Sequence, residues 1–174
     1  MIITIEVLQS MFSDNVQKLF YILDNLKIEY KLYNHVEMNT VDDINKLDIR
    51  FHGQYCKNLF LKNSKGDIHY LVILMDCKRA DLKKLAQTIH STRLSFDTEE
   101  NLYKYLKLKP GSVTPFGLIN DFQREIVVLI DSDLIDMNAI NFHPNINTST
   151  ITVSYMGLKK FLDWHGNKVY NVCI

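Results

Sequence analysis

CKNLFLKN (residues 56–63) and DIHYLVILM (residues 67–75) are the two neighbouring segments that decide the fold. The residues NSKG (63–66) between them favour a tight turn, so residues 56–75 are predicted to form a β-hairpin. The run LVIL (71–74) has no polar alternation, which indicates a strand that is covered on both faces.

A lysine occupies an unexpected place in this hairpin. Side chains alternate along a strand, so Lys57 is predicted to share a face with Leu59 and Leu61. One explanation is structural, because a lysine stem can lie along apolar surface while its ammonium reaches water. The other is functional, with the ammonium held at the rim of a site. The spacing alone leaves both open.

The composition is typical of an ordinary globular domain. Hydrophobic residues make up 47% of the 174 residues and charged residues 23%, so residues 1–174 are expected to form a single domain. No apolar run approaches the length of a membrane span, and the N-terminus does not resemble a signal peptide. The widely spaced Cys56, Cys77 and Cys173 lack the pairing of a zinc site or disulfide framework, so a reduced, cytoplasmic protein without metal is expected.

The charges are unevenly distributed although the formal net charge is zero. Residues 46–93 contain ten Lys and Arg against four Asp and Glu. Zero net charge argues against general nucleic-acid coating, whereas a basic middle could bind one phosphate-bearing ligand or RNA end. The alternative is that these lysines are solvated charges on helices and turns.

The remaining segments indicate helices and strands around one sheet. Apolar spacing predicts a helix from residue 13 to about 26, and others over 80–90, 97–108 and about 157–163. A short helix over 40–47 is predicted from a capping pattern. Strands are expected at 28–35, at 125–131 and in the later part of 141–155. Without a regular βαβ alternation, this is a mixed α/β (α+β) fold.

Two loops carry the other candidate site residues. GSVTPFGLIND (111–121) combines prolines, glycines and small polar residues, and such a loop can present backbone groups to a ligand. In NFHPNIN (141–147), Pro144 favours an extended backbone at His143, whose imidazole could bind a substrate group or transfer a proton. Taken alone, each loop is better explained as structural: the first as a turn between a helix and a strand, the second as a histidine bonded to neighbouring Asn side chains. Signatures of nucleotide hydrolases, serine hydrolases and zinc proteases are absent from the sequence.

Three of these segments resemble one family. CKNLFLKN, GSVTPFGLIND and FHPNINTSTITVS occur in the order and approximate spacing seen in YbaK-like aminoacyl-tRNA deacylases, which include the ProX-type proteins and the editing domain of bacterial prolyl-tRNA synthetases. The resemblance covers essentially the whole chain. The KNLFL and VTPFGL segments look most like the stand-alone branch that removes alanine from proline tRNA.

The resemblance implies a fold and a reaction. The fold would be a curved mixed β-sheet surrounded by helices, with a pocket at one end. The reaction would be hydrolysis of the ester between a wrong amino acid and the 3′-terminal adenosine of tRNA, without a metal or organic cofactor. The implied partner is aminoacyl-tRNA, with neither DNA nor a membrane involved, and the sequence leaves open whether prolyl-tRNA synthetase takes part.

The resemblance also assigns the catalytic candidates. Lys57 matches the essential lysine of the family, and His143 matches the histidine of its FHP motif. Asn58 follows the lysine as in close relatives. His35 lies where relatives often have a histidine, although Val36 replaces the proline that usually follows it and makes this assignment weaker.

Substrate-binding candidates come from the second loop and from the hairpin. Gly111, Ser112 and Pro115 match the loop that bounds the aminoacyl pocket in the family. Phe60, Val113 and Phe116 are expected to shape a small, partly apolar pocket, because they adjoin these motifs.

The expected chemistry depends on Lys57. An ammonium is a point-charge phosphate binder that could orient the ester and stabilise the tetrahedral intermediate. Water would be the nucleophile, because no Ser-His or Cys-His pair is evident. The expected substrate is alanine on proline tRNA. Cysteine or serine on tRNA and a non-catalytic module that binds aminoacyl-tRNA or a synthetase are the alternatives.

Overall fold

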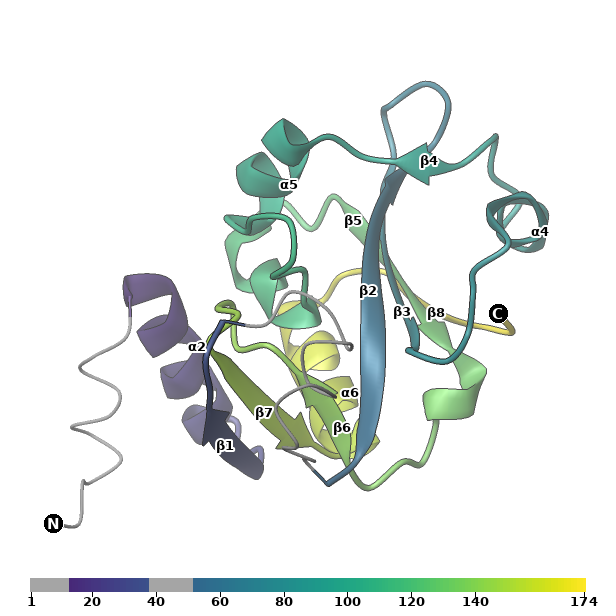
Figure 1. The fold of residues 1–174 in the computed structure, drawn as a ribbon. Helices are drawn as coiled ribbons and strands as arrows, with labels where there is room; N and C mark the ends of the chain where they lie inside the picture. The colour runs from purple at the N-terminus through teal and green to yellow at the C-terminus, as the bar shows by residue number, and fades with distance from the viewer. Residues whose placement is uncertain (1–12, 38–51) are drawn as a thin grey trace, which may run out of the picture.

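The structure, a computed structural model, describes residues 13–37 and 52–174. Its centre is an open mixed β-sheet in which neighbouring strands follow the order β1-β7-β6-β2-β3-β5-β8, with the short β4 paired to β2 (Figure 1). The predicted mixed α/β class is confirmed. The strands are β1 (Tyr30–Asn34), β2 (Gln54–Lys62), β3 (His69–Met75), β4 (Ser95–Phe96), β5 (Ile126–Asp131), β6 (Ile140–Phe142), β7 (Ser149–Val153) and β8 (Val169–Val172).

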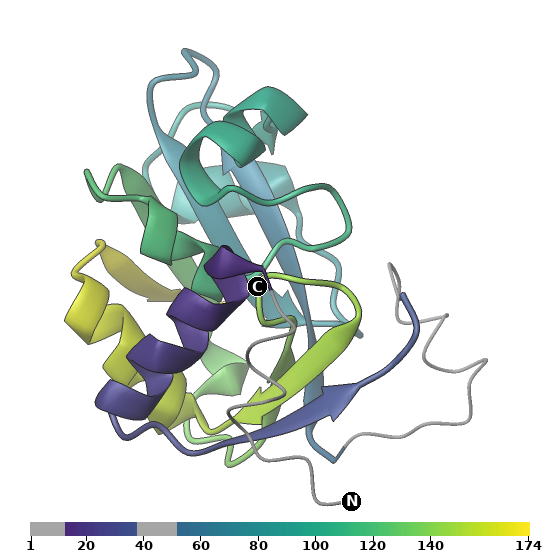
Figure 2. The same ribbon diagram turned by 90° about the vertical axis from the view of Figure 1, so that its left-hand side faces the viewer.

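Helices cover the two faces of the sheet unequally. Buried residues of α2, α5, α6 and the 3-10 helix η1 form the main core against one face, and Figure 2 shows α2 and α6 together on one side of β1 and β7. Among the described residues, helix α4 packs on the other face, over a small core. These elements are α2 (Asp14–Asn25), α4 (Leu82–Thr88), α5 (Glu99–Leu106), α6 (Tyr155–His165), η1 (Pro115–Asn120) and a second 3-10 helix η2 (Ser132–Leu134).

The predicted hairpin is confirmed. Strands β2 and β3 pair antiparallel, with Lys57 opposite Leu74 and Leu61 opposite Tyr70. Strand β3 is buried on both faces, as its continuous apolar run predicted: Leu71 and Ile73 lie in the main core, and Val72 and Leu74 lie in the small core. The hairpin therefore separates the two cores.

The predicted helices and strands elsewhere are confirmed with small changes of boundary. Helix α4 begins where the Asp81 side chain accepts hydrogen bonds from the backbone N–H groups of Lys83 and Lys84. The helix predicted over 40–47 lies outside the described residues. No helix within 13–37 or 52–174 is both long and apolar enough to cross a membrane.

The C-terminal part differs from the prediction. The strand predicted in the later part of residues 141–155 is confirmed as β7, but the start of this range belongs to β6 rather than to a loop. Between the two strands the chain turns, with Asn145 in the left-handed region at φ +63°. Helix α6 starts earlier than predicted, since the Ser154 side chain accepts a hydrogen bond from the Gly157 N–H. Strand β8, which was not predicted, pairs parallel with β5 and forms one edge of the sheet.

Candidate active site

Lys57 lies on the face of β2 that the alternation predicted. Leu59 and Leu61 of the same face pack in the small core under α4. The Lys57 side chain is exposed, and its Nζ donates a hydrogen bond to the main-chain oxygen of Lys78 at 3.2 Å. Lys57 therefore lies at the edge of the small core rather than within it.

Beyond Lys57 the same face of the sheet becomes polar. Residues that pair directly across strands point to the same side, and the pairs Tyr55–Asn141, Asn141–Thr152 and Thr152–Lys31 extend the face of Lys57 across β6, β7 and β1. We call this surface the polar half of the face. It comprises Lys31, Tyr33, Tyr55, Asn141, Thr150 and Thr152.

The two candidate histidines meet at this polar half. The Nε2 of His35 is 2.9 Å from the Oγ1 of Thr150. The rings of His35 and His143 lie 6.2 Å apart between centroids. Two segments that are distant in the sequence, after β1 and after β6, thus place their imidazoles on the side of the sheet that carries Lys57.

The hydrogen bonds of His143 define its chemistry. Its Nδ1 is 3.0 Å from the main-chain oxygen of Ser149, which can only accept, so Nδ1 carries the proton and Nε2 is an acceptor in the neutral ring. Burial lowers the pKa of His143, and the nearby His35 lowers it further, although the bond to Ser149 opposes this shift. His143 is therefore neutral at pH 7 and can accept a proton or hydrogen bond.

The loop predicted to bound the pocket contacts the His143 segment. The Asn145 side chain donates a hydrogen bond to the main-chain oxygen of Phe116 at 3.3 Å. The Phe116 ring packs edge-on against Phe142, with centroids 5.8 Å apart. Two motifs that the sequence placed about thirty residues apart are thus physically joined.

Several predicted substrate-binding residues lie on the other side of β2. Phe60 and Phe116 are buried in the main core, 5% and 1% exposed, and Pro115 is buried beside Phe116. Asn58 also follows the alternation to the side opposite Lys57. The structure does not bring these residues to the polar half, so their binding roles stay predictions.

The first residues of the loop 111–121 lie closer to the surface than Pro115 and Phe116 do. Gly111 is exposed, Val113 is half-buried against the main core, and Ser112 is buried with its N–H bonded to the Lys109 oxygen. Two buried amide oxygens, Oδ1 of Asn58 and Oδ1 of Asn145, have no hydrogen-bond partner among residues 13–37 and 52–174. Such orphaned acceptors are costly unless a ligand or water supplies a donor.

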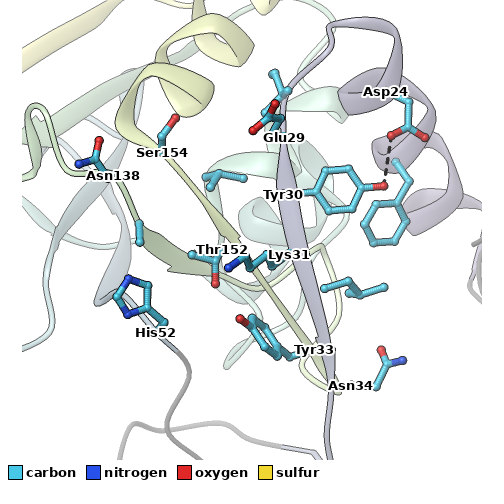
Figure 3. Close-up of a pocket in the computed structure, with 15 residues that line it drawn as sticks. Asp24, Glu29, Tyr30, Lys31, Tyr33, Asn34, His52, Asn138, Thr152 and Ser154 are labelled. Carbon is cyan, nitrogen blue, oxygen red and sulfur yellow. Dashed lines mark hydrogen bonds between the residues drawn. The ribbon is translucent and has the colours of Figure 1, made fainter.

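A groove of about 1000 Å³ was not predicted from the sequence. It runs along both sides of β1 and is lined by Lys31, Tyr33, His52 and Thr152 on the side of the polar half (Figure 3). None of the predicted site residues lines it. The alternating Thr150 and Thr152 are the feature of the sequence that could have indicated this groove, but the alternation predicted only a strand.

The basic residues near Lys57 have different surroundings. The ammonium of Lys78 lies 2.8 Å from Asp131 and 2.7 Å from Asp133, so its charge is compensated. Lys83 and Lys84 are exposed on α4. Among residues 13–37 and 52–174, no three His, Cys, Asp or Glu side chains are grouped in a way that could hold a metal ion.

Comparison with known proteins identifies the family. The model of the aminoacyl-tRNA editing domain matches residues 35–161. The chain is 43% identical to the Prolyl-tRNA editing protein ProX of Acetoanaerobium sticklandii, over 83% of this chain and 88% of that protein. It is 29% identical to Prolyl-tRNA synthetase associated domain-containing protein 1 of Danio rerio, over 81% and 77% of the two chains.

A solved structure supports the same fold. A candidate trans-editing enzyme for prolyl tRNA synthetase superposes with a TM-score of 0.66 over 94% of this chain and 99% of that one, at 18% identity. At this identity the likeness concerns the fold alone. With the family model and the 43% identical relative, however, the assignment is clear: the chain belongs to the aminoacyl-tRNA editing domain family. It is an aminoacyl-tRNA deacylase, which hydrolyses the ester between an amino acid and tRNA.

Proposed function

We propose that this protein removes alanine from mischarged proline tRNA, acting as a separate protein after the synthetase has made the error. The observation that carries the proposal is the 43% identity to a prolyl-tRNA editing protein over most of both chains. A prolyl site discriminates poorly against smaller amino acids, because a missing methylene costs only about 1–3 kcal/mol. A second site that admits alanine and excludes proline corrects this error.

The polar half of the face is the surface on which we place the 3′ end of the tRNA. Lys57 projects its ammonium at the edge of this surface, where it attracts the phosphodiester and orients the ester. The same charge stabilises the oxyanion that forms when water attacks the ester carbonyl. Its hydroxyl, amide and ammonium groups provide the hydrogen-bond donors and acceptors that an RNA 3′ end requires.

His143 is the second group in this mechanism. Its neutral ring presents Nε2 as an acceptor, which can take a hydrogen bond from the attacking water or from a hydroxyl of the terminal adenosine. The contact between Asn145 and Phe116 holds the His143 segment against the second loop. Prolyl-tRNA synthetase is a further partner in this proposal, as the source of the mischarged tRNA.

The test is hydrolysis of tRNA charged with alanine, proline, cysteine or serine, measured with the wild-type protein and with Lys57→Ala. We expect rapid loss of alanine, slow loss of proline, and a rate about 100-fold lower or more in the variant, as when a single oxyanion donor is removed. Lys62→Ala is the matched control, since Lys62 ends the same strand away from the polar half.

Other outcomes have definite meanings. Preferential loss of cysteine or serine would transfer the proposal to that amino acid. Stability of every ester in the presence of the protein, with binding retained, would leave a module that binds aminoacyl-tRNA without turnover. An unchanged rate in Lys57→Ala would remove Lys57 from the mechanism.

A further inference from the structure

The segment between β3 and α4 is attached to a buried acid. Asp131, the last residue of β5, is fully buried, and its Oδ1 accepts a hydrogen bond from the Lys78 Nζ at 2.8 Å. The same ammonium lies 2.7 Å from Asp133, whose side chain is 59% exposed. The other oxygen of Asp131, Oδ2, is buried and has no hydrogen-bond partner in the part of the chain that the structure describes.

Lys78 also contacts Lys57, through a different group. Its main-chain oxygen accepts the hydrogen bond from the Lys57 Nζ at 3.2 Å. The start of the segment is held separately, because the Asp76 N–H donates to the Tyr55 oxygen and the Gln54 side chain donates to Asp76. The carbonyl that meets Lys57 therefore belongs to a residue whose side chain is anchored on β5.

Stability alone explains this arrangement poorly. A buried carboxylate loses its hydration, and replacing a buried ion pair with apolar groups of similar size is often neutral or stabilising. Burial by itself would lower the pKa of Lys78, but the hydrogen bonds to Asp131 and Asp133 outweigh it and raise the pKa above its ordinary value. The lysine stays charged, so the bond to Asp131 persists throughout the neutral range.

We propose that Asp131 is a positioning residue for Lys57 that acts through Lys78. By holding the Lys78 side chain, Asp131 fixes the main-chain carbonyl that orients the Lys57 ammonium towards the substrate. A flexible lysine that is exposed otherwise samples many rotamers, and catalysis suffers when a reacting group is misplaced by about 1 Å. The inference rests on the proposed role of Lys57 in ester hydrolysis.

The experiment is a double-mutant cycle on the deacylation rate, measured with protein in excess over charged tRNA. Asp131→Asn keeps the shape of the side chain and removes its charge, and we expect a rate about tenfold lower. In the Lys57→Ala background the same change should have no further effect, because the group that Asp131 positions is gone. Asp133→Asn is the matched control and should lower the rate less than about twofold, since Asp131 still holds Lys78.

Asp131→Asn could also lower the rate by unfolding the protein, and it would then do so in both the wild-type and the Lys57→Ala backgrounds. The double-mutant cycle therefore distinguishes unfolding from a loss of Lys57 positioning. Equal factors in the wild-type and Lys57→Ala backgrounds, or an unchanged rate in Asp131→Asn, would overturn the inference while leaving the catalytic role of Lys57 intact. If Asp131→Asn is unfolded, the pair Lys78→Met with Asp131→Leu replaces the ion pair by apolar groups. We expect that pair to fold and still to lose about tenfold in rate.

A second measurement does not depend on turnover. The NMR signal of the Lys57 Cε–H group, assigned by its absence in Lys57→Arg, should shift and sharpen in Asp131→Asn as the side chain becomes mobile, but not in Asp133→Asn. An unchanged signal in Asp131→Asn would contradict positioning even if no ester tested is hydrolysed. Absence of any deacylation by the wild type, by contrast, would count against the proposed function.

Discussion

One face of the sheet has two halves that differ in chemistry although they share strand β2. Under α4, Leu59 and Leu61 of β2 join an apolar cluster that includes Val72 and Leu74 of β3. Beyond Lys57 the same face carries Tyr55 and its polar neighbours on β6, β7 and β1. A single strand therefore supports a core at one end and a candidate active site at the other.

The position of Lys57 follows from this division. It occupies the last position on this face of β2 before the face changes from apolar to polar, and its side chain is exposed. At such a boundary an ammonium can reach water while its stem lies along apolar surface. The structural and functional explanations that the sequence left open are thus compatible. Lys57 adjoins the small core and shares its face of the sheet with the polar half, and substitutions on the two sides should have separable effects.

The largest expected effect is on stability, from the apolar half. Leu61 is fully buried in the small core, so Leu61→Ala should lower the free energy of unfolding by about 2–5 kcal/mol through lost transfer free energy and the remaining cavity. Chemical denaturation measures it. The deacylation rate per folded molecule should be unchanged, because Leu61 does not contact the polar half.

Leu59→Ala is the matched control for this substitution. Leu59 lies on the same face but is only half-buried, so a smaller loss of stability is expected. If Leu59→Ala destabilised the protein more than Leu61→Ala, the apolar half would extend to Lys57, and the boundary that we describe would be misplaced.

The sequence predicted the hairpin and the amphipathic helices well, because their patterns are local. Continuous apolar residues in β3 identified a strand with two covered faces, and the alternation in β2 placed Lys57 beside Leu59. Strand β8 was missed because three of its four residues are exposed and its pairing with β5 depends on residues more than thirty positions away. A mostly exposed strand at the edge of a sheet leaves no hydrophobic pattern in the sequence from which it could be predicted.

The candidate site was predicted unevenly for a related reason. Lys57, His143 and His35 came from motifs, and the structure places all three on one side of the sheet. Phe60 and Phe116 were expected in the pocket because they adjoin those motifs, yet their side chains are in the main core. Phe60 follows Lys57 at an odd spacing in β2 and therefore lies on the opposite face, and Phe116 belongs to η1, which packs on the main core. The polar half was missed because its residues come from four strands that only the fold brings together.

The next effect concerns a buried hydrogen bond of the polar half. The Thr152 Oγ1 donates to the Asn141 Oδ1 at 2.6 Å, and both residues are buried. Thr152→Val leaves the Asn141 oxygen without a donor and should cost about 1–3 kcal/mol of unfolding free energy. Asn141→Leu together with Thr152→Val removes both partners and should return the stability to within about 1 kcal/mol of the wild type.

This pair of variants sharpens the comparison between the two halves. The double variant replaces the buried polar pair by apolar side chains without a net loss of stability. Its deacylation rate at low tRNA concentration should fall several-fold if this pair positions the exposed side chains of the polar half against RNA. Wild-type activity in a stable double variant would show that the buried pair has no part in substrate binding.

The smallest effect is the dependence of stability on pH, which comes from a histidine far from both halves. His165 is the last residue of α6. Burial lowers its pKa, and the nearby positive charges of Arg124 and Lys18 lower it further. Asn167 and Asp121 oppose this shift without cancelling it. Because the unfolded chain, with a pKa near 6.5, binds the proton more readily, the free energy of unfolding should be greatest above pH 6.5 and fall as the pH is lowered below it. Urea denaturation between pH 5 and pH 8 measures this slope. His165→Gln should flatten this slope, whereas His90→Gln, at an exposed histidine, should not. An unchanged slope in His165→Gln would assign the pH dependence to other groups. His143 is the next to test, because burial lowers its pKa as well.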